Sequence, residues 1–75
     1  MTKNKAQAPS RSDHVALLTD LPALRLVRGQ VGTIVQEIDS EIVLVEFSDK
    51  RGRAYAFASC RRDQLLVLRD EPQVD

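Results

Sequence analysis

Hydrophobic residues in this chain come in short runs separated by turn-forming residues, a spacing typical of strands. Valine, isoleucine, leucine and threonine dominate these runs, and the intervals between turns are too short for helices. A longer connection over residues 21–28, with Pro22 as its breaker, divides the first two runs. The pattern predicts five strands, at residues 14–18, 30–38, 42–47, 53–59 and 64–68.

The connections between these strands have recognisable turn chemistry. Asp39 and Ser40 predict a tight turn, because their short side chains bond back to their own backbone. Residues 48–52 predict a second turn, in which Gly52 takes a positive φ. Residues 60–63 are too short and polar for a strand and predict a single 3₁₀ turn.

Alternation between the two faces of a strand is clear only in part of the chain. On strand 42–47 the apolar side chains of one face alternate with Glu46 on the other; the apolar ones are Val43, Val45 and Phe47. Gly32 lies inside strand 30–38, where an isolated glycine usually marks a bulge or a close approach of another backbone. This strand has apolar residues of both parities, which we interpret as a bend at Gly32 that lets it feed the core on both sides. Together these elements predict an all-β fold, a small five-stranded SH3-like barrel whose closure leaves little unpaired edge.

Length and charge limit this fold to one small domain. A chain of 75 residues has room for a single core. Residues 1–12 are polar and basic and residues 70–75 are acidic, so we expect two disordered tails around a barrel at 13–69. One cysteine excludes an internal disulfide, and we expect neither a transmembrane helix nor a secretory leader. These features predict a soluble, cytoplasmic protein.

Few residues could carry catalysis. His14, the only histidine, follows Asp13 at a strand start and is expected to be an ordinary polar residue there. Cys60 has two arginines beside it that would favour a thiolate, but we prefer a small, half-buried residue near the 3₁₀ turn. One Cys and one His supply too few ligands for a structural zinc site. The carboxylates between residues 37 and 49 form a solvated acidic end without a shielding cleft. We therefore predict no enzyme activity, metal site or cofactor.

Several segments carry a resemblance to a known family. The stretch LVRGQVGTIV at residues 26–35 is preceded by VALLTDLP at 15–22 and followed by VEFSDKRGRAYA and DQLLVL. Over residues 13–68 this resembles a small bacterial family catalogued as domain of unknown function 4926, which implies an SH3-like barrel with no assigned activity. More remotely, the segment from Arg28 to Gly32 is similar to SH3-like barrels of the nitrile hydratase β subunit, of a photosystem I peripheral subunit and of the KOW element. In such relatives the barrel docks or scaffolds, and the likeness brings no catalytic residues.

A protein-binding function is the first hypothesis. The loop at 21–28 carries more apolar residues than so small a core is expected to bury, with arginines beside them. Its alternative role is to cap one open end of the barrel. With the neighbouring basic turn, the predicted contact residues are Leu24, Arg25, Leu26, Val27, Arg28, Lys50, Arg51 and Arg53. The partner would be an unidentified protein, and one form of the hypothesis is a small regulator or antitoxin-like partner of a neighbouring gene product.

Nucleic-acid binding by a KOW-like barrel is the alternative hypothesis. It would use Arg51, Arg53, Tyr55, Arg61 and Arg62. If Tyr55 and Phe57 face outward, they form a surface on which bases can stack. The area that aromatic side chains bury argues that both face the core, and equal numbers of acids and bases argue against a phosphate ligand. We therefore expect a protein partner rather than a nucleic acid, and no membrane.

Overall fold

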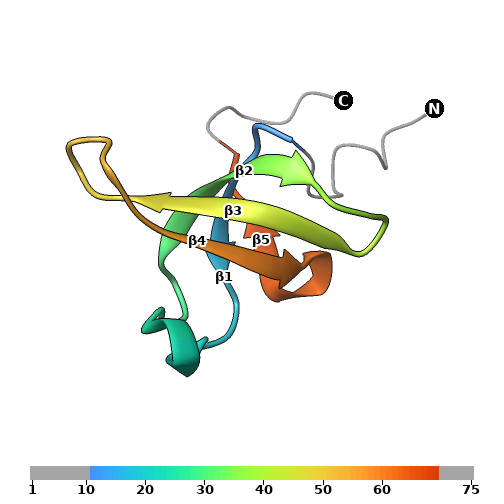
Figure 1. Cartoon of the computed structure of the whole chain (residues 1–75), viewed down its shortest axis with the longest axis horizontal. Helices are drawn as coiled ribbons and strands as arrows, with labels where there is room; N and C mark the ends of the chain where they lie inside the picture. The colour runs from blue at the N-terminus through green and yellow to red at the C-terminus, as the bar shows by residue number, and fades with distance from the viewer. Residues whose placement is uncertain (1–10, 70–75) are drawn as a thin grey trace.

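The computed structural model describes residues 11–69, which form one antiparallel sheet (Figure 1). Its order is β4-β3-β2-β1-β5, and two 3₁₀ turns, η2 and η3, complete the elements. The bounds are β1 His14–Leu17, η2 Pro22–Leu24, β2 Val31–Glu37, β3 Ile42–Ser48, β4 Ala54–Arg61, η3 Arg62–Gln64 and β5 Leu65–Val67. The all-β class and the five strands are confirmed. Strand β4 extends further than predicted, so Cys60 belongs to the strand and not to the turn.

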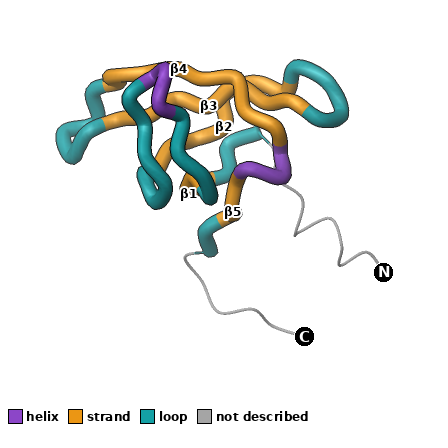
Figure 2. The backbone as a smooth tube through the Cα atoms, turned by 90° about the horizontal axis from the view of Figure 1, so that it is seen from below, coloured by secondary structure: helices purple, strands orange, loops and turns teal. Residues whose placement is uncertain are grey.

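The sheet curls around its inner face, but β4 and β5 are not hydrogen-bonded neighbours among residues 11–69. Figure 2 shows the strands descending from β4 to β5, with the loop between β1 and β2 beside them. The closure expected of a barrel is therefore incomplete, and β4 and β5 are edge strands. The inner face holds the core, formed by Val15, Leu17, Leu26, Ile34, Val43, Val45, Phe47, Ala58, Cys60 and Leu65.

Strand β2 shows why one position must be glycine. A Cβ on Gly32 would lie 2.7 Å from the backbone oxygen of Glu46, so the expected close backbone approach is confirmed. The bulge lies elsewhere, because the register between β2 and β3 shifts between Ile34 and Gln36. The prediction that a bend at Gly32 feeds the core from both parities is wrong: Ile34 is buried, whereas Val31 is exposed. Strand β2 contributes mainly one face to the core.

The loop between β1 and β2 folds back over the core. Leu21 N donates to Leu26 O at 2.8 Å, and Leu26 N donates back to Leu21 O at 3.2 Å. This pairing places the Leu26 side chain inside, where 1% of its surface is exposed. The capping role left open for this loop is therefore fulfilled by Leu26.

Strand β4 has the opposite orientation to the one expected. Tyr55 and Phe57 are 51% and 55% exposed, so the prediction that they fill the core is wrong. The inner face of β4 instead carries Ala58 and Cys60, both buried. Small residues suffice there because Phe47 of β3 and Leu26 of the loop already occupy the interior.

Of the two predicted disordered tails, only the end of the N-terminal one lies within the described residues. Residues 1–10 and 70–75 lie outside the described residues, and the expectation of disorder there is not tested. Arg11 and Ser12, assigned to the N-terminal tail, lie along β2: Ser12 N donates to Ile34 O at 2.8 Å, and Arg11 N donates to Glu37 Oε2 at 3.2 Å. Within 11–69, no helix has the length and apolar character needed to cross a membrane.

Candidate interaction surface

The loop between β1 and β2 presents four of its five predicted contact residues to solvent. Leu24 is 48% exposed and Val27 is 55% exposed, and Arg25 and Arg28 are exposed as well. Leu26 is the exception, because it is held in the core and is not available to a partner. Arg28 N donates to Asp20 Oδ1 at 2.9 Å, which ties the end of the loop to its beginning.

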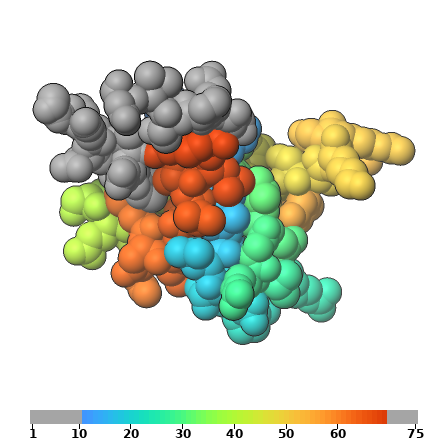
Figure 3. Space-filling view, turned by 180° about the vertical axis from the view of Figure 1, so that it is seen from behind, coloured from blue at the N-terminus to red at the C-terminus, as the bar shows by residue number. Residues whose placement is uncertain are grey.

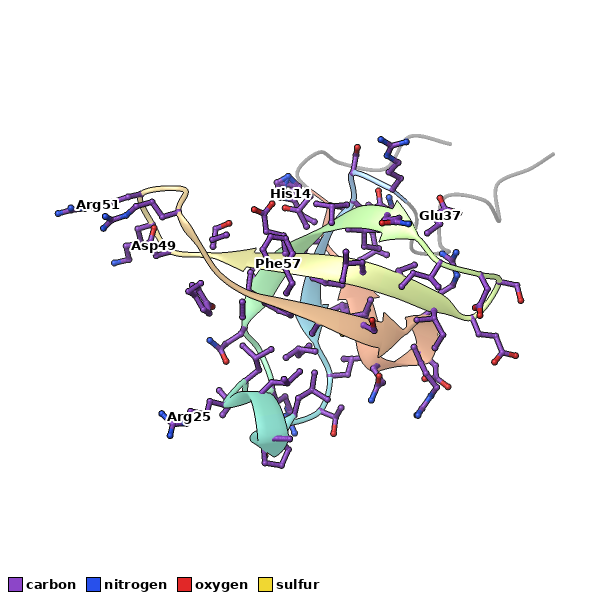
Figure 4. The ribbon with its side chains drawn as sticks, viewed as in Figure 1. His14, Arg25, Glu37, Asp49, Arg51 and Phe57 are labelled. Atoms are coloured by element: carbon purple, nitrogen blue, oxygen red, sulfur yellow. The ribbon has the colours of Figure 1, made fainter. Side chains whose placement is uncertain are left out.

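The turn between β3 and β4 presents the second predicted group. Asp49 Oδ1 accepts hydrogen bonds from Arg51 N at 2.8 Å and from Arg53 N at 3.0 Å. Gly52 has a φ of 82°, as predicted, and donates its N–H to Asp49 O. The turn stands out from the body of the molecule (Figure 3), and Arg51 points away from it (Figure 4). Arg53 lies 3.7 Å from Asp49 in an exposed ion pair.

Gln30 links the loop to β4 just beyond the turn, and no sequence pattern indicates this contact. Its Oε1 accepts a hydrogen bond from Val27 N at 2.6 Å, and its Nε2 donates to the Tyr55 hydroxyl at 2.9 Å. The loop and β4 are thereby held side by side. We call the combined area the loop–hairpin surface, formed by Leu24, Arg25, Val27, Arg28, Lys50, Arg51, Arg53 and Tyr55.

The two remaining arginines lie at the other end of β4. Arg61 is eight residues beyond Arg53, which at about 3.3 Å per residue is roughly 26 Å. Its Nε lies 3.1 Å from Asp63 Oδ1. Arg62 packs on the β2–β3 turn, donating from Nε to Ser40 O at 2.9 Å and from its terminal nitrogen to Glu37 Oε1 at 3.4 Å. The fold therefore does not bring together the five residues predicted for nucleic-acid binding.

Acidic residues between 37 and 49 lie at both ends of the sheet. Figure 4 shows Glu37 at one end and Asp49 with Arg51 at the other. Asp39, which fixes the β2–β3 turn by accepting from Glu41 N and Ile42 N, lies at the Glu37 end. The acidic end expected from residues 37–49 is thus split. The charged residues of the loop–hairpin surface are arginines and one lysine, and Asp49 lies beside them in an ion pair with Arg53.

Cys60 and His14 are not arranged as a catalytic pair. Cys60 is buried on β4, and burial raises the pKa of its thiol, so activation by the neighbouring arginines is not seen. It is more deeply buried than the half-buried residue predicted. His14 is exposed on β1 and pairs with Thr33. Within the described part of the chain, no three His, Cys, Asp or Glu residues are grouped to hold a metal ion.

Comparison with known proteins yields one match. No curated protein and no solved structure matches the chain. The model of the family described as Domain of unknown function (DUF4926) matches residues 12–67. That match includes all five strands and the whole loop–hairpin surface, and it covers well over half of the chain. The chain therefore belongs to the DUF4926 family.

Proposed function

We propose that this chain is a non-enzymatic protein-binding module and that its partner docks on the loop–hairpin surface. The proposal rests on one observation: the side chains of Leu24, Val27 and Tyr55 are exposed on a part of the fold that hydrogen bonds hold in place. Each has about half of its surface in solvent, and Gln30 bonds to both the Val27 backbone and the Tyr55 hydroxyl. A preorganised apolar patch loses little entropy when a partner binds.

The residues around this patch fit a protein interface. Tyrosine and arginine are among the side chains that contribute most to binding energy at interfaces. Tyr55 is bonded through Gln30 to the loop that carries Arg25 and Arg28, and it follows Arg53 of the turn by two residues, so an apolar centre has a basic margin. A partner with an acidic rim around an apolar patch would match it in charge.

The proposal extends to the setting of the domain. We propose that the five-stranded antiparallel order, with a 3₁₀ turn before the last strand, is an SH3-like arrangement that acts as a docking unit in the bacterial cytoplasm. A small regulator, or an antitoxin-like partner of a neighbouring gene product, is one role that this surface would suit.

Partner capture by surface variants tests the proposal. Leu24→Ser together with Val27→Ser removes two apolar side chains without touching the core, and Ile38→Ser is a matched control because Ile38 is 49% exposed at the opposite end. We expect a protein captured from the native cell by the wild type to be lost by the double variant and kept by the control. Circular dichroism must show cooperative melting for all three proteins. Equal capture by the double variant and the wild type rejects the surface.

A second candidate function is single-stranded nucleic-acid binding, favoured by the outward orientation of Tyr55 and Phe57. Both lie on one face of β4, where bases could stack. Only Arg51 and Arg53 of the predicted basic residues could contact a nucleic acid stacked there, because Arg61 and Arg62 lie at the other end of β4. Glu46 pairs directly with Phe57 and places a carboxylate beside that ring, which disfavours phosphate. We therefore rank this function below protein binding.

Salt dependence separates the two functions. Nucleic-acid binding should weaken steeply between about 50 and 200 mM salt, because it releases counterions from phosphates. Fluorescence anisotropy with labelled single-stranded DNA and RNA measures this, with Tyr55→Ala as the test variant and Arg61→Ala as the control. The absence of binding at the lower salt concentration eliminates the nucleic-acid function.

A further inference from the structure

Strand β4 is a long edge strand with few of the features that keep edges apart. Within residues 11–69 it pairs with β3 and with no other strand. Figure 2 shows it as the outermost strand. Edge strands are usually short, or carry lysine, proline or inward charges that prevent pairing with another chain. Residues 54–60, AYAFASC, contain none of these, and the strand has eight residues.

Two hydrogen bonds at the end of β4 establish which backbone groups face outward. Arg62 N donates to Glu41 O at 2.9 Å, toward the β3 side. Arg61 N donates instead to Gln64 Oε1 at 2.8 Å, away from β3. Antiparallel strands alternate in this way, and the register is regular from Ile42 opposite Arg61 to Phe47 opposite Ala56. The N–H and C=O groups of Phe57 and Ser59 therefore point away from β3.

We infer that β4 pairs antiparallel with β4 of a second copy of this chain, about a two-fold axis at Ala58. In that register Phe57 lies opposite Ser59 of the second copy, and Ser59 lies opposite its Phe57. Each is a hydrogen-bonded pair that exchanges both N–H···O bonds. The groups that face outward in one chain thus satisfy the same groups in the other, and two sheets become one.

Side chains favour this register over one centred on Phe57. Tyr55 lies opposite Arg61 of the second copy, so a cation meets an aromatic face at both ends of the paired segment. A shift that centres the axis on Phe57 would set Arg53 opposite Arg61 of the second copy, which repels. On the inner face, Ala58 meets its own copy and leaves room for the two sheets to continue. The strand is self-complementary, which favours a second copy over an unrelated extended peptide.

Oligomeric state tests the pairing. Ser59→Pro removes an N–H that points away from β3, a position where an edge strand tolerates proline, so the monomer should still fold. Ser59→Thr keeps the N–H and is the control. Sedimentation equilibrium should give about twice the 8.4 kDa chain mass for the wild type and the control, and a single chain mass for Ser59→Pro. Ser59→Lys, which keeps the backbone intact, should weaken the dimer about tenfold through edge charge.

Amide hydrogen exchange identifies the surface used. In the dimer, the Phe57 and Ser59 amides should be protected, and dilution to monomer should remove that protection while the β3-facing amide of Ala58 keeps its own. A wild type that stays monomeric at millimolar concentration overturns the inference. A dimer with unprotected Phe57 and Ser59 amides also overturns it, because another surface would then form the contact. A monomer in which an added extended peptide protects these amides assigns the edge to a different occupant and equally rejects the homodimer.

Discussion

At the scale of single residues, Gln30 joins two parts of the candidate surface. Its side-chain amide is both donor and acceptor, and each half serves a different element: the loop backbone at Val27 and the hydroxyl of Tyr55. The nearest residues in sequence give no hint of this contact, since Gln30 and Tyr55 are separated by 25 positions. The amide oxygen accepts from the loop backbone, and the amide nitrogen donates to the tyrosine hydroxyl.

Replacing Gln30 should loosen the loop more than the strands. We expect Gln30→Ala to lower the free energy of unfolding by about 1 kcal/mol, as the loss of partly exposed hydrogen bonds implies. Tyr55→Phe is the matched control, because it removes only the bond to the hydroxyl. Urea unfolding gives the stability, and faster amide exchange at Val27 in Gln30→Ala but not in Tyr55→Phe would locate the effect. Equal exchange in both variants would contradict the bridging role.

The burial of Cys60 should make the stability of the fold depend on pH in the alkaline range. Burial raises its thiol pKa above the ordinary value of 9.0, so above about pH 9 the unfolded chain loses this proton while the folded chain keeps it. The free energy of unfolding should therefore fall as pH rises through that range, and below pH 9 this contribution should be constant. Cys60→Ala should lack this component, so its stability difference from the wild type should shrink between pH 8 and pH 10. Urea titrations at a series of pH values measure it; a constant difference would contradict the burial effect.

At the scale of elements, turns are secured by side chains that bond to neighbouring backbone. Asp39 and Asp49 each accept hydrogen bonds from two N–H groups of their own turn. Such turns could be predicted because the residue types and their spacing are local. Arg62 is different: it joins η3 to the β2–β3 turn across more than twenty positions, and no local pattern predicts that contact.

Replacing Gly32 by alanine should lower the free energy of unfolding substantially, although it adds only one methyl group. In Gly32→Ala the new Cβ would lie 2.7 Å from Glu46 O and 2.7 Å from Val45 Cγ1, so β2 and β3 must separate. We expect a loss of about 1–3 kcal/mol in the free energy of unfolding, the range for overpacking a filled interior. Gln36→Ala, on the exposed face of the same strand, should stay within about 0.5 kcal/mol. Urea unfolding compares the two, and similar values would show that the strands adjust without cost.

At the scale of the whole molecule, the core is completed only when the last strand pairs with the first. Strand β5 lies against β1, and its Leu65 is 6% exposed whereas the adjacent Leu66 is 51% exposed. This strand of three residues therefore adds one core side chain, one partly buried side chain packed against the core, that of Val67, and one solvent-facing side chain. Because β1 also pairs with β2, it joins the two halves of the sheet.

These adjacent leucines make a paired stability test. Leu65→Ala should lower the free energy of unfolding by about 2–5 kcal/mol, a large share of the total for so small a domain. Leu66→Ala, which removes the same atoms from an exposed site, should change it by about 0.5 kcal/mol or less. Thermal and urea unfolding measure both. A similar loss in the two variants would place Leu66 in a contact that this fold does not contain.

The pattern of turns and apolar runs was enough to predict the strands, and the resemblance was enough to predict the family. The pattern was not enough to orient β4, because its alanines and its aromatic residues alternate and either set could face the core. The prediction that aromatics fill the core was wrong because Leu26 of the loop occupies the interior instead. This placement depends on contacts between residues distant in sequence, which no local pattern indicates. The loop and the basic turn were each identified, but the bond from Gln30 to Tyr55, which joins the loop to β4, depends on the tertiary fold.

Tyr55 has a practical consequence that follows from its place in the fold. The chain has one tyrosine and no tryptophan, so Tyr55 dominates its intrinsic fluorescence. Its hydroxyl bonds to Gln30 at the centre of the loop–hairpin surface. The protein thus contains an unlabelled optical reporter at the site where a partner is proposed to bind. Titration with a partner that lacks both tryptophan and tyrosine can be followed by the emission of Tyr55, without modifying either molecule.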